Sequence, residues 1–141
     1  MAGDTTLTII GRLTADPELR FTQAGTAVSN FTIASNPRTF DRTTGEWRDA
    51  DPLFLRCTCW KQLAENAAAS LTRGSHVIAH GRLRQRTFDK DGTRHTVTEL
   101  DVDDIGAALR FATVTITKTD RANTPAATRE PVTVGADEPD F

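Results

Sequence analysis

The chain has 141 residues and a formal net charge of −2, with 38% hydrophobic and 26% charged residues. This length accommodates one domain with a buried core and a modest extension. No apolar run approaches the roughly 20 residues that cross a bilayer. The first residues also lack the basic and apolar regions of a secretory signal. We therefore expect a cytoplasmic protein that has no contact with a membrane.

Acidic side chains are concentrated at the C-terminus. Residues 120–141 hold five acidic side chains and two arginines, whereas the rest of the chain holds 14 acidic and 15 basic ones. This last segment is also rich in Thr, Ala and Pro and poor in large apolar residues, a composition typical of disorder. These features predict a folded domain over residues 1–112, a short extra strand over 113–119 and a disordered acidic tail over 120–141.

Apolar side chains alternate with polar ones along most of the folded part, as they do in half-buried strands. The alternation predicts strands at residues 7–13, 27–35, 53–60, 75–88 and 94–102. The segment 61–72 is different, because its apolar residues recur at helical spacing around an alanine-rich middle. Arg73-Gly74 then provides a stop signal, so this segment is predicted to be a helix.

Five strands with a helix between the third and the fourth follow the order of the OB fold. In that fold the helix plugs a barrel, and one face of the barrel binds oligonucleotides. Gly11 and Gly81 lie inside predicted strands, at positions where a curling strand can bend. The sequence thus predicts a mainly β protein, namely a five-stranded OB-fold barrel with one helix between strands 3 and 4, an extra C-terminal strand and a disordered tail.

The strand at 53–60 has two unlike faces, because successive side chains point to opposite sides of a sheet. One face is small or apolar and is expected to face the core: Leu53, Leu55, Cys57 and Cys59. The other face combines aromatic rings with a cation: Phe54, Arg56, Thr58 and Trp60. Such a face can stack nucleobases while its guanidinium meets phosphate. The two cysteines are expected to pack as small hydrophobes, and the alternative is a disulfide between subunits.

The strand at 75–88 repeats this arrangement and carries a basic stripe on its outer face: Arg82, Arg84 and Arg86, followed by Phe88. Like charges on one strand face repel each other unless an anion lies over them. We interpret the stripe as a phosphate-binding surface, and the alternative is a solvated charged face. Asp91-Gly92 predicts a tight hairpin turn after this strand.

The segment 36–52 interrupts the alternation with prolines and glycine, and it interleaves arginines with aromatic residues, among them Arg38, Phe40 and Trp47. We predict a long mobile hairpin loop with its tip near Thr43-Thr44-Gly45. Loops of this length are commonly functional, so one interpretation is a flap over single-stranded nucleic acid. The other is a solvated loop whose tryptophan packs down on the barrel.

No motif for catalysis or metal binding stands out. The sequence contains no Gly-rich phosphate loop and no recognisable Ser/His/Asp context. Asp101, Asp103 and Asp104 lack the spacing of a calcium loop, so we interpret them as structural or solvated residues. We therefore expect a protein without enzymatic activity, bound metal or cofactor.

Several segments, taken in order, resemble the bacterial single-stranded DNA-binding protein family. The resemblance covers roughly residues 5–110 and is carried by Ile10-Gly-Arg-Leu-Thr-Ala-Asp-Pro-Glu-Leu-Arg-Phe21, Asn30-Phe-Thr-Ile-Ala34, Thr44-Gly-Glu46, the strand ending at Trp60, Leu71-Thr-Arg-Gly-Ser75 and Gly81-Arg-Leu-Arg-Gln-Arg86. The segment after Leu109 is similar to the actinobacterial branch, in which an added strand clasps subunits within a homotetramer.

The resemblance implies that Phe54, Trp60 and Phe88 are the main base-stacking residues. Arg20-Phe21 belongs to the family pattern. A fourth stacking aromatic of the family aligns at or beside Thr39, where either Phe40 replaces it or the stacking contact is lost. The implied function is to bind and protect single-stranded DNA, with little sequence specificity, during replication, recombination and repair. The implied location is the nucleoid.

The tail departs from the family pattern. Family members usually have a longer linker, several aspartates and an adjacent Pro-Phe tip that recruits replication and repair proteins. This chain ends with an acidic segment that keeps the terminal phenylalanine but separates it from proline: Asp137, Glu138, Asp140 and Phe141. From this departure we expect a specialised paralogue. The alternative to single-strand coating is an OB-fold protein-interaction or assembly module with weak nucleic-acid binding.

Overall fold

The computed structural model describes residues 3–119. Along this part of the chain the elements are β1 (Thr6–Leu13), β2 (Glu18–Phe21), β3 (Ala27–Ser35), β4 (Arg38–Asp41), β5 (Glu46–Asp49), β6 (Leu53–Trp60), α1 (Lys61–Ser70), β7 (His76–Lys90) and β8 (Thr93–Ala107). The predicted helix between the third and fourth long strands is confirmed, and so is the mainly β fold. β2 was not predicted, and β8 continues beyond the residue at which the predicted return strand ends.

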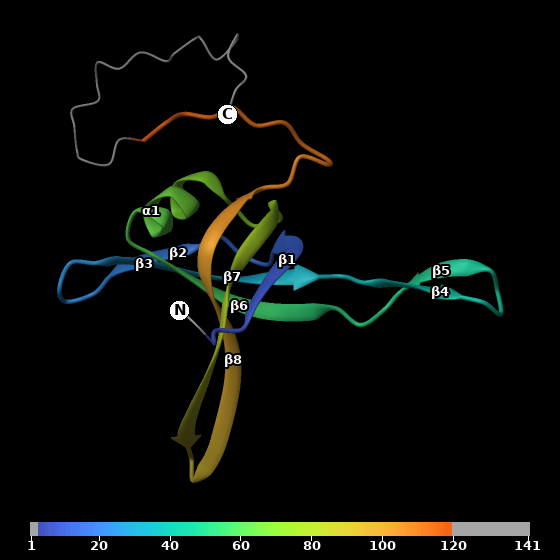
Figure 1. Cartoon of the computed structure of the whole chain (residues 1–141), viewed down its shortest axis with the longest axis horizontal. Helices are drawn as coiled ribbons and strands as arrows, with labels where there is room; N and C mark the ends of the chain where they lie inside the picture. Colours follow the sequence, from blue (N-terminus) through green and yellow to red (C-terminus); the bar gives the residue numbers. More distant parts are fainter. Residues whose placement is uncertain (1–2, 120–141) are drawn as a thin grey trace.

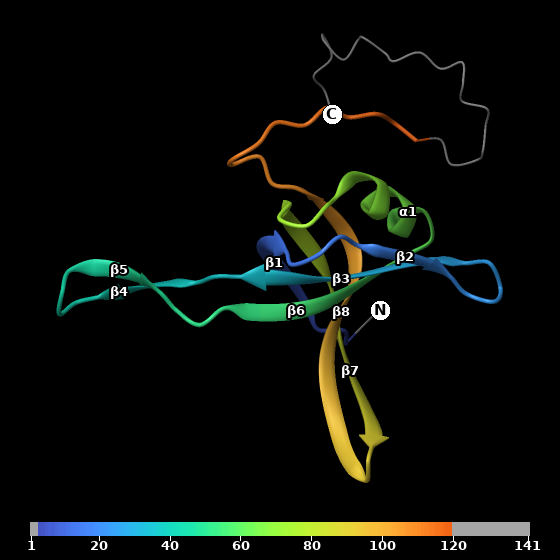
Figure 2. The same ribbon diagram turned by 180° about the vertical axis from the view of Figure 1, so that it is seen from behind.

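The larger sheet has the strand order β1-β7-β8-β6-β3-β2, and β1 also pairs with β3. The pairings of the five long strands therefore return to their starting point, as the OB fold requires. α1 packs against β3, β6 and β2 (Figure 1). Seen from behind, the same helix lies beside the start of the C-terminal segment (Figure 2).

The core lies inside this circuit and is formed by the inward residues of the alternating strands. Fully buried members from four different elements are Ile33, Cys57, Val77 and Leu100. The predicted inner face of β6 is confirmed for Leu55, Cys57 and Cys59 but is wrong for Leu53, which is 55% exposed because β6 begins beyond the edge of the core.

Gly11 and Gly81 are required by close backbone approach rather than by an unusual φ. A Cβ on Gly11 would collide with the carbonyl of Ala34, and a Cβ on Gly81 with the carbonyl of Asp101. A β-bulge lies between His80 and Gly81, and bulges bend a strand and increase its twist. The predicted bends at both glycines are thus explained by the crossing of strands that lie very near each other.

Two hairpins project from the core in different directions (Figure 1). β4 and β5 form one of them, with Gly45 near its tip at a positive φ of 74°. The predicted tip is correct, but the segment forms two regular strands rather than a loop without structure of its own. The other projection is a two-stranded arm, which is formed by the second half of β7 and the first half of β8.

The predicted extra strand at 113–119 does not form within the described chain, where residues 112–119 pair with no strand. A strand needs a neighbour for its backbone hydrogen bonds, and this segment has no strand partner within the described chain. Val114 and Ile116 instead line an open hollow of about 410 Å³ against α1 and the end of β8. The predicted tail at 120–141 lies outside the described residues, and no helix among those described is long and apolar enough to span a membrane.

Candidate nucleic-acid interface

The outer face of β6 presents two exposed aromatic rings, with Phe54 at 60% and Trp60 at 45% exposure. They lie on the same face as Arg56 and Thr58 because their positions differ by two. Trp60 is the last residue of the strand, and Lys61 turns the chain directly into α1 with a positive φ of 58°. The predicted aromatic and basic face of this strand is therefore present.

The arm formed by β7 and β8 brings a second set of side chains to this face. Its turn has positive φ at both Asp91 (54°) and Gly92 (77°), as a type I′ turn requires. This two-residue turn sets the register, which places Arg84 opposite Glu99 and Arg82 opposite Asp101. Basic residues on β7 therefore face acidic residues on β8 across the arm.

Each arginine of the stripe is paired with at least one carboxylate of β8. Arg86 donates a hydrogen bond from Nη2 to Oε2 of Glu99 at 2.9 Å. Arg84 Nη1 lies 3.4 Å from Oδ2 of Asp101. The Asp101 oxygen is also 4.0 Å from Arg82 Nη2, and Arg82 Nε lies 3.4 Å from Asp103 Oδ1.

These pairs correct the argument from like-charge repulsion. The sequence suggested three arginines that needed an external anion, but the protein supplies its own anions from β8. The guanidinium groups of Arg84 and Arg86 nevertheless remain accessible, since both side chains are 60% exposed. Arg56 makes no hydrogen bond or ion pair within the part of the chain that the structure describes.

A hollow of about 490 Å³ joins the two sets of side chains. It is lined by residues of three strands: Thr58, Trp60, Arg84, Gln85, Arg86, Glu99 and Asp101. β8 lies between β6 and β7 and pairs in parallel with β6 at three positions, including Arg56 opposite Glu99. The basic stripe is therefore one strand removed from β6 rather than its immediate neighbour.

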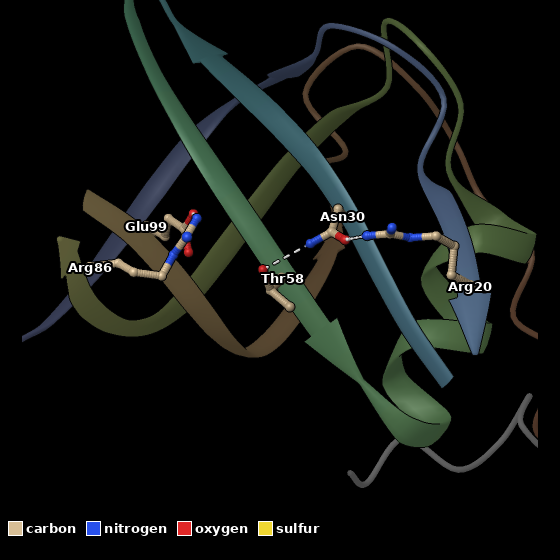
Figure 3. Close-up of polar contacts among 5 residues, drawn as sticks. All are labelled: Arg20, Asn30, Thr58, Arg86 and Glu99. Atoms are coloured by element: carbon tan, nitrogen blue, oxygen red, sulfur yellow. Dashed lines mark hydrogen bonds and ion pairs between the residues drawn. The ribbon is translucent and has the colours of Figure 1, made fainter. Parts of the chain in front are cut away.

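A row of hydrogen bonds extends this surface from β6 to β2, as Figure 3 shows. Arg20 Nη2 donates to Oδ1 of Asn30 at 3.0 Å, and Asn30 Nδ2 donates to Oγ1 of Thr58 at 3.0 Å. Arg20 thus joins the predicted outer face at Thr58 through Asn30, a residue that sequence reasoning had not singled out. Its side chain alternates with buried neighbours on β3, which is the signal that could have placed it on the outer face.

Phe88 lies farther along the arm. Its ring stacks on His95 with a centroid separation of 5.6 Å and an interplanar angle of 20°. The guanidinium carbon of Arg86 lies 5.5 Å from the Phe88 ring centroid. Phe88 is 36% exposed, so one part of the ring remains accessible for a further stacking partner.

The β4–β5 hairpin holds the remaining predicted residues and points away from the arm (Figure 2). Phe40 packs edge-on against Trp47 at 5.3 Å between ring centroids, and Arg38 Nε lies 3.6 Å from Oδ1 of Asp49. Trp47 is 59% exposed and packs on Phe40 rather than on the core. The structure therefore does not bring Arg38 and Phe40 into the hollow at Trp60.

The buried thiols of β6 are separated from this surface by the sheet itself. Burial raises the pKa of the Cys57 thiol from 9.0 to about 12, and the neighbouring Cys59 adds to the effect. Burial also raises the pKa of Cys59 to about 12. Both side chains are fully buried, which favours packing over a disulfide between subunits. The described residues contain no group of three or more His, Cys, Asp or Glu side chains able to hold a metal ion.

The strand circuit, the single helix between β6 and β7, and the outer face of aromatic and arginine side chains are those of the OB-fold class. Residues 4–108 match the model of the Single-strand binding protein family, and the chain belongs to that family.

Named relatives agree with this assignment. The chain is 59% identical over 123 residues to the "Single-stranded DNA-binding protein" of Mycolicibacterium smegmatis, covering 86% of this chain and 74% of that protein. It is 58% identical over 120 residues to "Single-stranded DNA-binding protein 2" of Streptomyces coelicolor, covering 84% and 60% respectively. The crystal structure of the small single-stranded DNA-binding protein from Streptomyces coelicolor is similar with a TM-score of 0.67 and 30% identity, covering 76% of this chain and 96% of that one.

Proposed function

We propose that this protein binds single-stranded DNA with little sequence preference and protects it during replication, recombination and repair. The observation that carries the proposal is the shared hollow, which is lined by Trp60 together with Arg84 and Arg86. Aromatic rings stack on any base, and guanidinium groups bind any phosphate, so the surface suits a ligand recognised without regard to sequence. The family and the printed names of the relatives support the same function.

In this proposal Phe54, Trp60 and Phe88 stack bases. Arg56 is available for phosphate without breaking an ion pair, whereas Arg82, Arg84 and Arg86 exchange a carboxylate for phosphate. Arg20 lies at the far end of the hydrogen-bonded row and would contact the strand as it leaves β6. We expect no catalytic step, because stacking and charge neutralisation need none.

Arg38 and Phe40 are proposed as a peripheral contact for longer strands, since the hairpin projects beyond the central surface. Replacing both residues, as Arg38→Gln/Phe40→Ala, should leave the affinity for a short oligonucleotide unchanged and weaken that for a long one. An equal loss for both lengths would place the hairpin in the central surface.

We further propose a homotetramer. Along residues 6–11 the described part of β1 pairs only with β7, so one backbone edge is open. Ile10 and Ile78 are exposed beside this edge, at 52% and 42%. Residues 113–119 could then form their strand against a neighbouring subunit, and light scattering of the full chain and of a chain ending at residue 112 would test both points.

The acidic residues Asp137, Glu138 and Asp140 of the tail are proposed to contact replication or repair proteins together with Phe141. A carboxylate-rich segment with a terminal aromatic can bind a basic pocket that has an apolar floor. The proposal is tested by comparing co-purification of replication and repair proteins with the full chain and with a Phe141→Ala variant, and equal recovery would contradict it.

The central proposal is tested by titrating the full chain with oligo-dT at low salt while tryptophan fluorescence is measured. Stacking on Trp60 should quench the emission, and Trp60→Phe should remove much of the signal even though Trp47 remains. Affinity should fall as salt rises, because bound phosphates release counterions. Weak binding that salt does not change would instead favour the protein-interaction module.

A further inference from the structure

We propose that Glu99 and Asp101 are specificity-determining residues that act through the arginines of β7 to select single strands over duplex DNA. This inference rests on the proposed function and concerns what the same surface rejects. It follows from one feature of the structure, namely that the predicted phosphate-binding stripe is already neutralised by carboxylates of the neighbouring strand.

The outward-facing side chains of β6, β8 and β7 form three adjacent columns. Arg56 on β6 lies opposite Glu99 on β8, which in turn lies opposite Arg84 on β7. In the next outward-facing row, Thr58 lies opposite Asp101, and Asp101 lies opposite Arg82. A column of carboxylates therefore runs between the aromatic face of β6 and the basic stripe of β7.

The two carboxylates lie deeper than the arginines they hold. Their side chains are 24% and 22% exposed, whereas Arg84 and Arg86 are 60% exposed. A phosphate can therefore reach an arginine that is still paired with its carboxylate. Because the carboxylate is part of the sheet, it cannot leave the surface and continues to repel the bound polyanion.

This arrangement penalises ligands according to their charge density and stiffness. Duplex DNA carries about one negative charge per 1.7 Å of helix axis, and its phosphates are fixed in place. A single strand is less densely charged and can turn its phosphates toward the arginines and away from the acids. It also offers unpaired bases to Trp60 and Phe54, whereas the bases of a duplex are stacked inside it.

The carboxylates thus serve as a repulsive element against the wrong partner, a common means of achieving specificity. Their effect depends on the arginines, because an arginine released from its carboxylate attracts any phosphate that approaches. Without Glu99 and Asp101, the stripe would attract duplex and single-stranded DNA through charge alone.

The experiment compares the wild-type chain with the double variant Glu99→Gln/Asp101→Asn. Binding of a labelled oligo-dT and of a duplex of equal length is measured by fluorescence anisotropy at several salt concentrations. We expect the affinity for the duplex to rise about tenfold or more and that for oligo-dT to rise at most about threefold. The salt dependence for oligo-dT should also become steeper, by up to about 0.7 in the log–log slope for each carboxylate removed.

A matched control changes the same number of charges away from this face. Asp104→Asn/Glu65→Gln removes one carboxylate whose Oδ1 accepts the backbone N–H of Ile105 and another that is exposed on α1. The control should leave both affinities close to wild type. An equal rise in the control would show that net charge, rather than the carboxylate column, is responsible.

Two further variants separate selection from a structural role. Glu99→Asp/Asp101→Glu retains both charges and should restore rejection of the duplex. In an Arg84→Gln/Arg86→Gln background the acid substitutions should no longer raise duplex affinity, because they act through these arginines. A wild-type chain that fails to bind oligo-dT would refute the proposed function, whereas good oligo-dT binding with no selective gain for the duplex would overturn only this inference.

Discussion

Arg86 reaches past its own register partner, Val97, to form a 2.9 Å hydrogen bond with Glu99, the residue that lies opposite Arg84. Arg84 in turn contacts Asp101, the register partner of Arg82. Arg86 and Arg84 therefore each bind the carboxylate that lies opposite the arginine two residues earlier in β7. The hydrogen bond to Glu99 raises the pKa of Arg86 above its ordinary value, and the charged group is held over the Phe88 ring.

The position of Phe88 on the arm leads to the first prediction. Replacing Phe88 with alanine should weaken oligo-dT binding by roughly 5- to 150-fold, because stacking of one base contributes about 1–3 kcal/mol. Binding is measured by anisotropy at constant salt. Phe111→Ala is the control, since Phe111 is an exposed ring that contacts His76 at the opposite end of β7. Similar losses for both variants would contradict stacking on Phe88.

Arg56 and Arg84 should differ in their contributions, because among the described residues Arg84 has a carboxylate partner and Arg56 has none. Arg56→Gln is expected to lower the affinity for oligo-dT more than Arg84→Gln, since the charge of Arg84 is already partly neutralised by Asp101. Each substitution should reduce the steepness of the salt dependence, by about 0.7 where one full phosphate contact is lost. A salt titration of the two variants checks this order, and a larger effect of Arg84→Gln would be evidence against it.

Gly81 should not tolerate a side chain. Gly81→Ala forces a Cβ into the carbonyl of Asp101, which the paired strand holds in place. We expect a loss of about 1–3 kcal/mol in the free energy of unfolding, measured by urea denaturation. Gly106→Ala is the matched control on β8, because a Cβ there meets no atom within 4 Å. Equal stability of the two variants would rule out close backbone approach as the reason for glycine at position 81.

The buried thiols should make stability depend on pH in the alkaline range. The folded protein keeps the protons of Cys57 and Cys59 up to about pH 12, whereas the unfolded chain loses them near pH 9.0. Their stabilising effect is therefore complete below pH 9 and declines as pH rises toward 12, by an amount on the order of 1 kcal/mol per thiol at pH 10.

Thermal unfolding between pH 8 and pH 10 measures this decline. The sequence contains no tyrosine, which removes one competing titration from that range. A Cys57→Ala/Cys59→Ala variant should start from a lower melting temperature but lose less of it as pH rises. A parallel decline in both proteins would mean that other groups cause the alkaline loss.

Local patterns were sufficient to predict much of this protein. Alternation of apolar and polar residues placed β3, β6 and the first half of β7, and helical spacing placed α1. The hairpin at Asp91-Gly92 was predicted from its dipeptide, and counting outward from that turn would also have paired Arg84 with Glu99. The turn therefore already implied this pairing, whereas the alternation along β7 alone shows only that the arginines share a face.

What the sequence by itself determined is which side chains share a face, because the two-residue period of a strand is a local property. Only the tertiary structure decided which faces meet, because strand pairing joins residues far apart in the chain. The parallel contact between β6 and β8 inserts carboxylates between the aromatic face and the arginines. The direction of the β4–β5 hairpin, which projects away from the core, also depends on how the strands leave the core rather than on the hairpin's own residues.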